Sequence, residues 1–185
     1  MSQTAIVALA GRRIDAGGSD QPRFPTGNVP IVRERLHDLL RGENVIAMVS
    51  SAACGSDIIA LEEAEQIQIR RRIVLPFAPD KFRASSVVDR PGSWGSAFDR
   101  LVASAERDDE LIIVGDADGD PAYAASNQRI IDEAQLLSRR FPGGPHRLLA
   151  VVVWEGQPRP DNDLTDHFRT SAIKAGFEVK VVLTT

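Results

Sequence analysis

Cysteine is nearly absent from this sequence. Cys54 is the one cysteine among 185 residues, so an intrachain disulfide is excluded. No apolar run approaches the roughly 18 residues that a membrane span requires. Residues 1–4, Met-Ser-Gln-Thr, lack the basic start and long apolar stretch of a signal peptide. These absences predict a cytoplasmic protein with no membrane among its partners.

A surplus of positive charge is also missing. Lys and Arg number 22 against 26 Asp and Glu, which gives a formal net charge of −4 at pH 7. A dedicated duplex-DNA binder usually carries a basic footprint, so we expect no sequence-specific nucleic acid among the partners. The chain has 3 dispersed histidines, which cannot build a structural zinc site with one cysteine. We therefore expect neither a metal nor a cofactor.

Several sequence motifs of common enzymes are not present. No G-x-G-x-x-G follows the first apolar run, and the chain contains no G-x-x-x-x-G-K-[ST] and no G-x-S-x-G. These absences argue against a standard dinucleotide fingerprint, a P-loop NTPase and an α/β-hydrolase. Residues 116–120 look like the start of a calcium loop, but Pro121 and Asn127 stand where glycine and glutamate are needed. We interpret this segment as a solvated acidic turn.

The sequence does contain a regular alternation of short apolar runs and longer amphipathic segments. The apolar runs, expected to be strands, cover residues 5–10, 44–49, 72–77, 110–114, 148–154 and 178–183. The amphipathic segments, expected to be helices, cover residues 29–41, 57–70, 93–106, 122–141 and 161–175. Continuous apolar runs are typical of strands covered on both faces. The pattern predicts an α/β fold, a three-layer, Rossmann-like, doubly wound and mainly parallel sheet of about six strands, in one domain over residues 1–185.

Two segments are longer than a connection between a strand and a helix requires. They are residues 11–30, after the first expected strand, and residues 78–92, after the third. Long loops in compact α/β domains are often functional. Ligands of such sheets bind beyond the carboxyl ends of the strands, where both loops begin. We therefore expect the functional site at this edge.

The first candidate group directly follows the first strand and comprises Gly11, Arg12 and Arg13. A glycine at a strand end lets a ligand or another backbone segment approach closely. Two arginines beside it have the fork geometry that binds phosphate oxygens. A surface loop with solvated charges is the alternative.

The second candidate group is the turn between the second strand and its helix. Its members are Ser50, Ser51, Ala52, Gly55, Ser56 and Asp57. Small residues at such a turn expose backbone N–H groups, and the helix N-terminus adds a partial positive charge. We interpret the turn as a cradle for an anion. Ser56 and Asp57 would alternatively serve as plain helix N-cap residues.

Two further groups complete the candidates. Glu62 lies seven residues after Gly55, roughly two turns along the helix, and would reach back to the cradle as an acid/base or hold a ribose hydroxyl. Phe82, Ser85 and Ser86 lie in the second long loop, where the phenyl ring would stack on a base and the hydroxyls would bond it. An exposed helix glutamate and ordinary loop packing explain the same residues without a ligand.

The order of the motifs points to a family. The motifs are Gly-Arg-Arg-Ile-Asp at 11–15, Arg-Phe-Pro at 23–25, Ser-Ala-Ala-Cys-Gly-Ser-Asp-Ile at 51–58, Leu-Pro-Phe at 75–77 and Val-Trp-Glu-Gly at 153–156, with Glu62, Phe82, Ser86, Val87, Trp94, Tyr123 and Asn127 between them. Together they resemble a bacterial branch of the SLOG superfamily, which groups SMF/DprA DNA-processing proteins with the Lonely Guy phosphoribohydrolases. The resemblance spans nearly the whole chain.

The resemblance implies a Rossmann-like domain that binds or senses a nucleotide or nucleotide-derived ligand in bacterial signalling. The partners it implies are a nucleotide-like small molecule, signalling proteins and a second copy of the chain in a dimer. Lonely Guy enzymes cleave an N-glycosidic bond, and an N-glycosidase with catalytic Glu62 and Arg13 is the first alternative. Their Pro-Gly-Gly-x-Gly-Thr turn is absent here. A protein-interaction module with a vestigial site is the second alternative.

Overall fold

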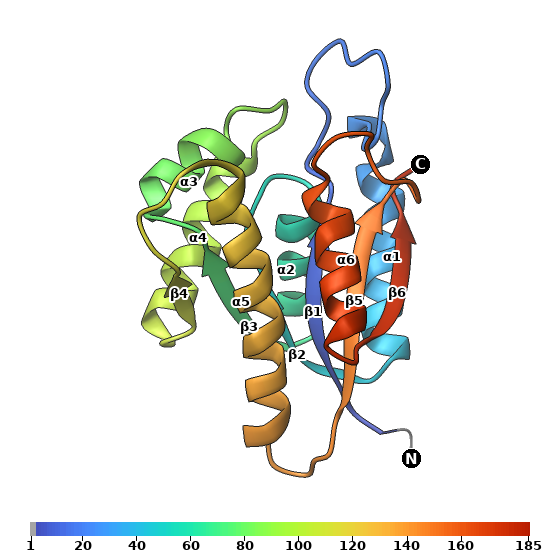
Figure 1. Ribbon diagram of the computed structural model, residues 1–185, viewed down its shortest axis with the longest axis vertical. Helices are drawn as coiled ribbons and strands as arrows, with labels where there is room; N and C mark the ends of the chain where they lie inside the picture. Colours follow the sequence, from blue (N-terminus) through green and yellow to red (C-terminus); the bar gives the residue numbers. More distant parts are fainter. Residues whose placement is uncertain (1–2) are drawn as a thin grey trace.

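Six parallel strands form the centre of the protein (Figure 1). The computed structural model describes residues 3–185. The strands are β1 (Ala5–Gly11), β2 (Val45–Ser50), β3 (Arg70–Leu75), β4 (Leu111–Ile113), β5 (Arg147–Trp154) and β6 (Glu178–Leu183). The helices are η1 (Thr26–Asn28), α1 (Val29–Gly42), α2 (Ser56–Gln66), α3 (Pro79–Ser86), α4 (Trp94–Arg107), α5 (Gly119–Arg140) and α6 (Leu164–Lys174).

The strand order creates one point at which the winding of the sheet reverses. The order is β4-β3-β2-β1-β5-β6, and every neighbouring pair is parallel. The chain winds outward from β1 to β4, then crosses back to place β5 on the other side of β1. At the end of β1, Gly11 pairs with Val153 of β5. In doubly wound sheets, ligands bind outside the carboxyl ends of the strands at such a switch point.

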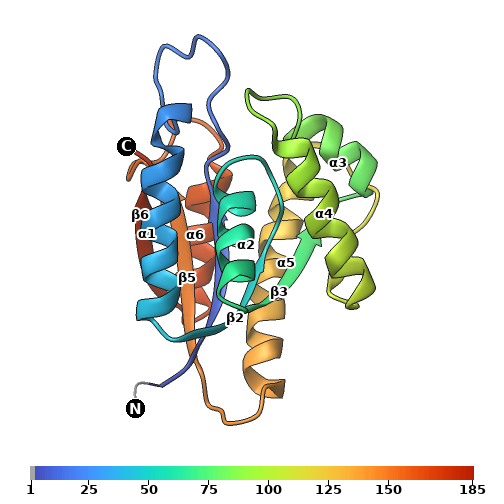
Figure 2. The same cartoon turned by 180° about the vertical axis from the view of Figure 1, so that it is seen from behind.

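Helices cover both faces of the sheet. Helices α5 and α6 lie over the face seen in Figure 1, and α1, α2 and α4 lie over the opposite face, seen in Figure 2. Alternate side chains of β1 enter the two cores: Val7 and Leu9 belong to one, Ile6 and Ala8 to the other, and all four are fully buried. A strand with both faces buried needs an unbroken apolar run, which explains the sequence pattern.

The predicted fold is confirmed: the sheet has six strands, is parallel throughout and lies between two helical layers. All six strands and the five predicted helices are present, with shifts of a few residues at their ends. Two short helices were missed, because η1 and α3 form within residues 11–30 and 78–92, which were expected to be loops. Helix α3 is only 8 residues long and begins with Pro79, so it contains too few turns to show a helical period.

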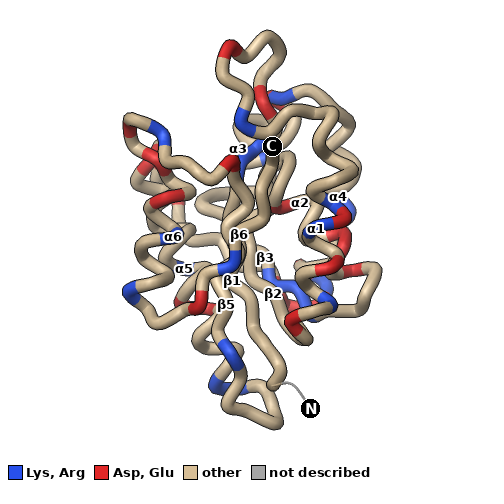
Figure 3. Tube along the Cα trace, turned by 90° about the vertical axis from the view of Figure 1, so that its right-hand side faces the viewer, with Lys and Arg blue, Asp and Glu red and all other residues tan. Residues whose placement is uncertain are grey.

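Charged residues of both signs are distributed over the surface. Figure 3 shows Lys and Arg positions interspersed with Asp and Glu positions on the side of the molecule that carries β6 and α1. None of the helices between residues 3 and 185 combines the length and the apolar character that a membrane span requires.

Candidate functional site

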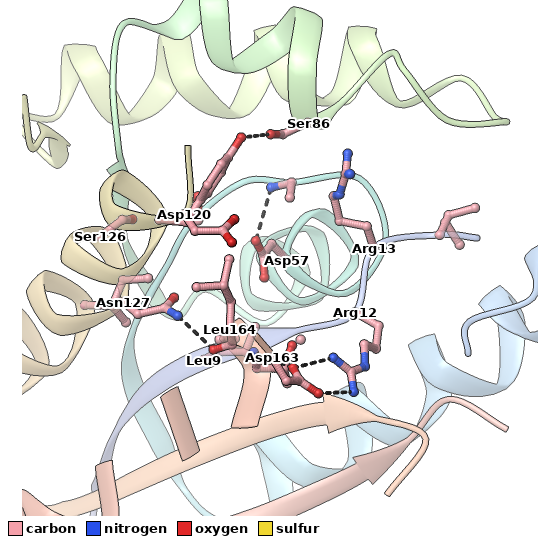
Figure 4. A pocket seen from close by; sticks show the side chains of 18 of the residues that line it. Leu9, Arg12, Arg13, Asp57, Ser86, Asp120, Ser126, Asn127, Asp163 and Leu164 are labelled. Atoms are coloured by element: carbon pink, nitrogen blue, oxygen red, sulfur yellow. Dashed lines mark hydrogen bonds and ion pairs between the residues drawn. The ribbon is translucent and has the colours of Figure 1, made fainter. Parts of the chain in front are cut away.

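A pocket of about 430 Å³ lies beyond the carboxyl end of β1, at the switch point of the sheet (Figure 4). Its wall is built by the end of β1, the starts of α2, α5 and α6, the end of α3, and the segments that follow α3 and β5. The volume is within the range of small-molecule sites. The starts of three helices therefore meet at one cavity.

Charges of both signs line this pocket. The arginines are Arg12, Arg13, Arg90 and Arg159, and the aspartates are Asp15, Asp57, Asp120 and Asp163. Their formal charges cancel, so the partners of each residue decide which charges are available to a ligand.

Arg12 is fully engaged with the protein. Its guanidinium is 3% exposed and donates hydrogen bonds to both carboxylate oxygens of Asp163, to both of Glu155 and to the carbonyl of Gln157. Burial alone would lower the pKa of Arg12, but these hydrogen bonds raise it. The residue expected to bind phosphate instead ties the segment after β1 to the segment after β5.

Asp163 is equally engaged. It is the N-cap of α6, where Oδ1 accepts the backbone N–H of Thr165 at 2.9 Å. Oδ2 accepts the backbone N–H of Arg159 at 2.7 Å. Burial alone would raise the pKa of Asp163, but the hydrogen bonds from Arg12 and Arg159 hold it well below its ordinary value. Asp163 and Arg12 thus form a closed structural unit on one wall of the pocket.

Arg159 presents the available cation. Its side chain forms no hydrogen bond and no ion pair with any other residue of the described chain, residues 3–185. Desolvation and the positive charges of Arg12 and Arg23 lower its pKa. The sequence analysis did not single out Arg159. The signal that could have found it is its place in the segment after β5, at the edge where the other candidates lie.

Arg13 and Arg90 add a second positive region at the rim. Both approach the same carboxylate: Arg13 Nη1 lies 2.8 Å from Asp89 Oδ2, and Arg90 Nε lies 3.5 Å from it. One carboxylate between two guanidinium groups leaves a positive excess. The Arg13 and Asp89 side chains are each 31% exposed, so this pair contributes little to stability and can rearrange for a ligand.

Asp57 lies in the middle of the pocket, between Asp120 on one side and Arg13 on the other (Figure 4). The residue is 7% exposed, and its Oδ2 accepts the backbone N–H of Ala53 at 3.1 Å. Its Oδ1 has no hydrogen-bond partner among the described residues, nor has Ser51 Oγ, another lining group. Burial raises the pKa of Asp57 to about 7.

The protein itself fills the expected anion cradle. The backbone N–H and the hydroxyl of Ser56 both donate to the carbonyl of Arg12, at 3.2 and 2.7 Å. The N–H of Ala53 is taken by the Asp57 carboxylate. Ser50, Ala52, Gly55 and Ser56 are buried and do not line the pocket, whereas Ser51 and Asp57 do.

Gly55 has a structural reason to be glycine. Its φ is +100°, and a Cβ there would lie 2.7 Å from the Ile14 backbone nitrogen. An isolated antiparallel bridge joins Gly55 to Arg13. At Gly55 the protein's own first loop therefore makes the close approach that only glycine allows.

Only some of the residues expected to close over a base are available to a ligand in the pocket. Phe82 touches the pocket but is 1% exposed, with its ring 6.1 Å from Phe77 and 6.0 Å from Phe98. Ser86 lines the pocket and its Oγ lies 2.8 Å from the Tyr123 hydroxyl. Ser85 lies outside and donates to the carbonyl of Lys81. The phenyl ring thus belongs to the core, as the alternative interpretation held.

Glu62 is not part of the pocket. It forms ion pairs with Arg33 of α1 at 2.8 Å and with Arg100 of α4 at 3.3 Å. The expectation that it reaches back to the cradle is corrected, because its position on α2 points it toward the neighbouring helices. Over residues 3–185 no group of three or more His, Cys, Asp and Glu side chains is arranged to hold a metal ion.

Comparison with known proteins gives one informative result. The sequence matches no protein-family model and no curated protein. A solved structure with a similar fold is DNA processing protein A (DprA) from Streptococcus pneumoniae, with a TM-score of 0.53 at 15% sequence identity. The match covers 97% of this chain and 49% of that structure, so this chain spans about half its length. This likeness confirms the Rossmann-like fold that the sequence predicted.

The same finding corrects the expected partners. The partners expected from the sequence were a nucleotide-like small molecule, signalling proteins and a second copy of the chain, and sequence-specific nucleic acid was excluded. The exclusion of nucleic acid is wrong, because this fold occurs in a protein described as a DNA processing protein. The expectation rested on the net charge of the whole chain, which does not show which individual charges are available to a partner.

Proposed function

We propose that this protein is a binding domain whose switch-point pocket holds a nucleotide through its phosphate. The nucleotide is either a free molecule or part of a nucleic-acid strand. The observation that carries the proposal is Arg159, an exposed residue of the pocket lining whose side chain forms no hydrogen bond or ion pair within residues 3–185. A phosphate would supply that partner through charge-assisted hydrogen bonds. The volume of about 430 Å³ leaves room for the sugar and base.

The charge distribution favours one place for the phosphate. At the start of α2 the pocket carries the Asp57 carboxyl group, which would repel a phosphate when it is ionised. Arg159, from the segment after β5, and Arg13 with Arg90 supply the positive charge. We therefore place the phosphate against these arginines rather than in the turn before α2.

A binding role agrees better with the geometry than N-glycosidase chemistry does. Cleavage of that type needs a carboxylate at the reacting carbon, and Glu62 was the residue expected to provide it. Glu62 instead pairs with Arg33 and Arg100 outside the pocket. The catalytic proposal therefore has no support from the residue that carried it.

Titration by fluorescence anisotropy tests the proposal. The probes are a labelled, 5′-phosphorylated single-stranded decanucleotide, titrated with protein, and the nucleoside 5′-monophosphates as competitors. We expect Arg159→Gln to weaken binding about tenfold or more, because a hydrogen bond to a charged group is lost. The matched control is Arg139→Gln, an exposed arginine near the C-terminal end of α5, at the opposite edge of the sheet.

The two kinds of probe also distinguish a site for a free nucleotide from a site for a nucleic-acid strand. Competition by monophosphates at low concentration indicates a site for a single nucleotide, whereas strand binding that monophosphates do not displace indicates a nucleic-acid site. Absence of binding to every probe, or equal losses in Arg159→Gln and Arg139→Gln, would reject the pocket as a phosphate site.

A further inference from the structure

We infer that Ser51 and Asp57 form a receptor for the sugar hydroxyls of the bound nucleotide, so that the pocket prefers ribose to a sugar without 2′- and 3′-hydroxyls. The inference rests on the proposed function and deepens it by naming a substrate class. It gives the role of sugar contact, first expected of Glu62, to groups that the structure places in the pocket.

The first support is the hydrogen bonding that these two side chains lack. Three buried side-chain polar atoms in the described part of the chain have no hydrogen-bond partner: Ser51 Oγ, Asp57 Oδ1 and Trp154 Nε1. The first two line the same pocket. A buried polar atom without a partner destabilises the folded protein. Two such atoms on residues that line one cavity are explained by a ligand that supplies the missing partners.

The second support is the chemistry of the free atoms. Asp57 Oδ2 already accepts the N–H of Ala53, so Oδ1 is left to face the ligand. An ionised Oδ1 accepts hydrogen bonds and repels phosphate oxygens, which are also acceptors. The Ser51 hydroxyl can donate and accept. Vicinal sugar hydroxyls match this pair, because each hydroxyl can also donate and accept.

The third support is the position of the two groups between the ends of the pocket. Asp57 occupies the middle of the cavity, with Arg13 on one side and Asp120 on the other (Figure 4). Arg159, the proposed phosphate partner, comes from a different wall, the segment after β5. In a nucleotide the sugar lies between the phosphate and the base. A phosphate at the arginines therefore places the sugar, rather than the base, against the middle of the pocket.

The experiment compares the four ribonucleoside 5′-monophosphates with their 2′,3′-dideoxy counterparts by isothermal titration calorimetry. We expect the wild-type protein to bind at least one ribonucleotide about tenfold or more tightly than its dideoxy form. In Asp57→Ala the ratio should fall toward one, and in Ser51→Ala it should fall partly. Asp38→Ala, an exposed acid on α1, is the matched control and should leave the ratio unchanged.

Where only strands bind, the same comparison is made with a 5′-phosphorylated decaribonucleotide and its deoxyribonucleotide form, because the 2′-hydroxyl distinguishes the two. Equal binding of the two sugar types by the wild-type protein overturns this inference and leaves the proposed function standing. A ribose preference that persists in both Asp57→Ala and Ser51→Ala overturns the assignment to these residues. No binding of any nucleotide or strand overturns the proposed function, and this inference with it. Asp57→Asn, which keeps the shape of the side chain, replaces Asp57→Ala if that variant does not fold.

Discussion

Arg12 and Asp163 form a two-point ion pair, in which Nη1 lies 2.7 Å from Oδ1 and Nη2 lies 2.8 Å from Oδ2. Their side chains are 2% and 4% exposed. The pair joins the residue that follows β1 to the N-cap of α6. It therefore fixes the two segments on either side of the switch point and gives the pocket one rigid wall.

Removing one member of this pair should destabilise the protein strongly. Arg12→Met keeps the volume of the side chain but leaves the buried carboxylate of Asp163 without its cation, and leaves Glu155 with Arg23 alone. We expect the free energy of unfolding, measured by urea denaturation, to fall by about 3–5 kcal/mol. Arg13→Met is the control, because the pair of Arg13 with Asp89 is partly exposed and should contribute less than about 1 kcal/mol. Similar losses in the two variants would contradict the structural role of Arg12.

The Asp57 carboxyl should make the ligand-free protein less stable as the pH rises from about 4 to about 7. Burial raises the pKa of Asp57 to about 7 in the folded state, whereas an aspartate in an unfolded chain titrates near pH ~3.9. Between these values the folded state retains a proton that the unfolded chain has released, so the free energy of unfolding decreases with pH. Above pH 7 both states are ionised and the contribution is constant.

Asp57→Asn isolates this contribution, because the amide has no proton to release in this range. We expect the stability of the wild type relative to the variant to fall by roughly a few kcal/mol between pH 4 and pH 8. Urea denaturation of both proteins across this range measures the difference. Parallel pH profiles would show that Asp57 titrates like an exposed aspartate and would remove the physical basis of this prediction.

Gly55 should be required for the fold rather than for ligand contact. A Cβ at this position would lie 2.7 Å from the Ile14 nitrogen, and the φ of +100° is unfavourable for any other residue. We expect Gly55→Ala to lower the free energy of unfolding by roughly 3 kcal/mol or more. Gly176→Ala separates the two causes: its φ is +87°, but nothing lies within 4 Å of its Cβ, so roughly 1–2 kcal/mol should be lost. Equal costs would show that the contact with the first loop contributes nothing.

The sequence was sufficient to predict the sheet, because most strands contain a continuous apolar run and each long helix shows its period. The sequence could not predict α3, because this helix has 8 residues and Phe82 is its one large apolar side chain, which is too little to show a helical period. Its aromatic partners, Phe77 and Phe98, lie on other elements and come together only in the folded chain.

The location of the site was also predictable, because parallel strands place their carboxyl ends at one edge. The role of each residue was not, since residue type does not reveal the partner. Arg12 and Arg159 are the same residue type at the same pocket, yet one is paired with Asp163 and the other has no partner in the described chain. Asp57 was taken for a member of an anion cradle, whereas its own carboxylate occupies the position of the anion.

Glu62 provides the last test, because it distinguishes a ligand confined to the pocket from a ligand that extends onto α2. Its carboxylate lies between Arg33 and Arg100 and is 23% exposed. We expect Glu62→Gln to leave binding of the decanucleotide and of the monophosphates within about twofold of wild type, since the residue does not line the pocket. The free energy of unfolding should fall by only about 0.2–1 kcal/mol for each pair that is weakened. A loss of binding in Glu62→Gln as large as that in Arg159→Gln would require a ligand that extends beyond the pocket onto α2, and would restore the glutamate to the site.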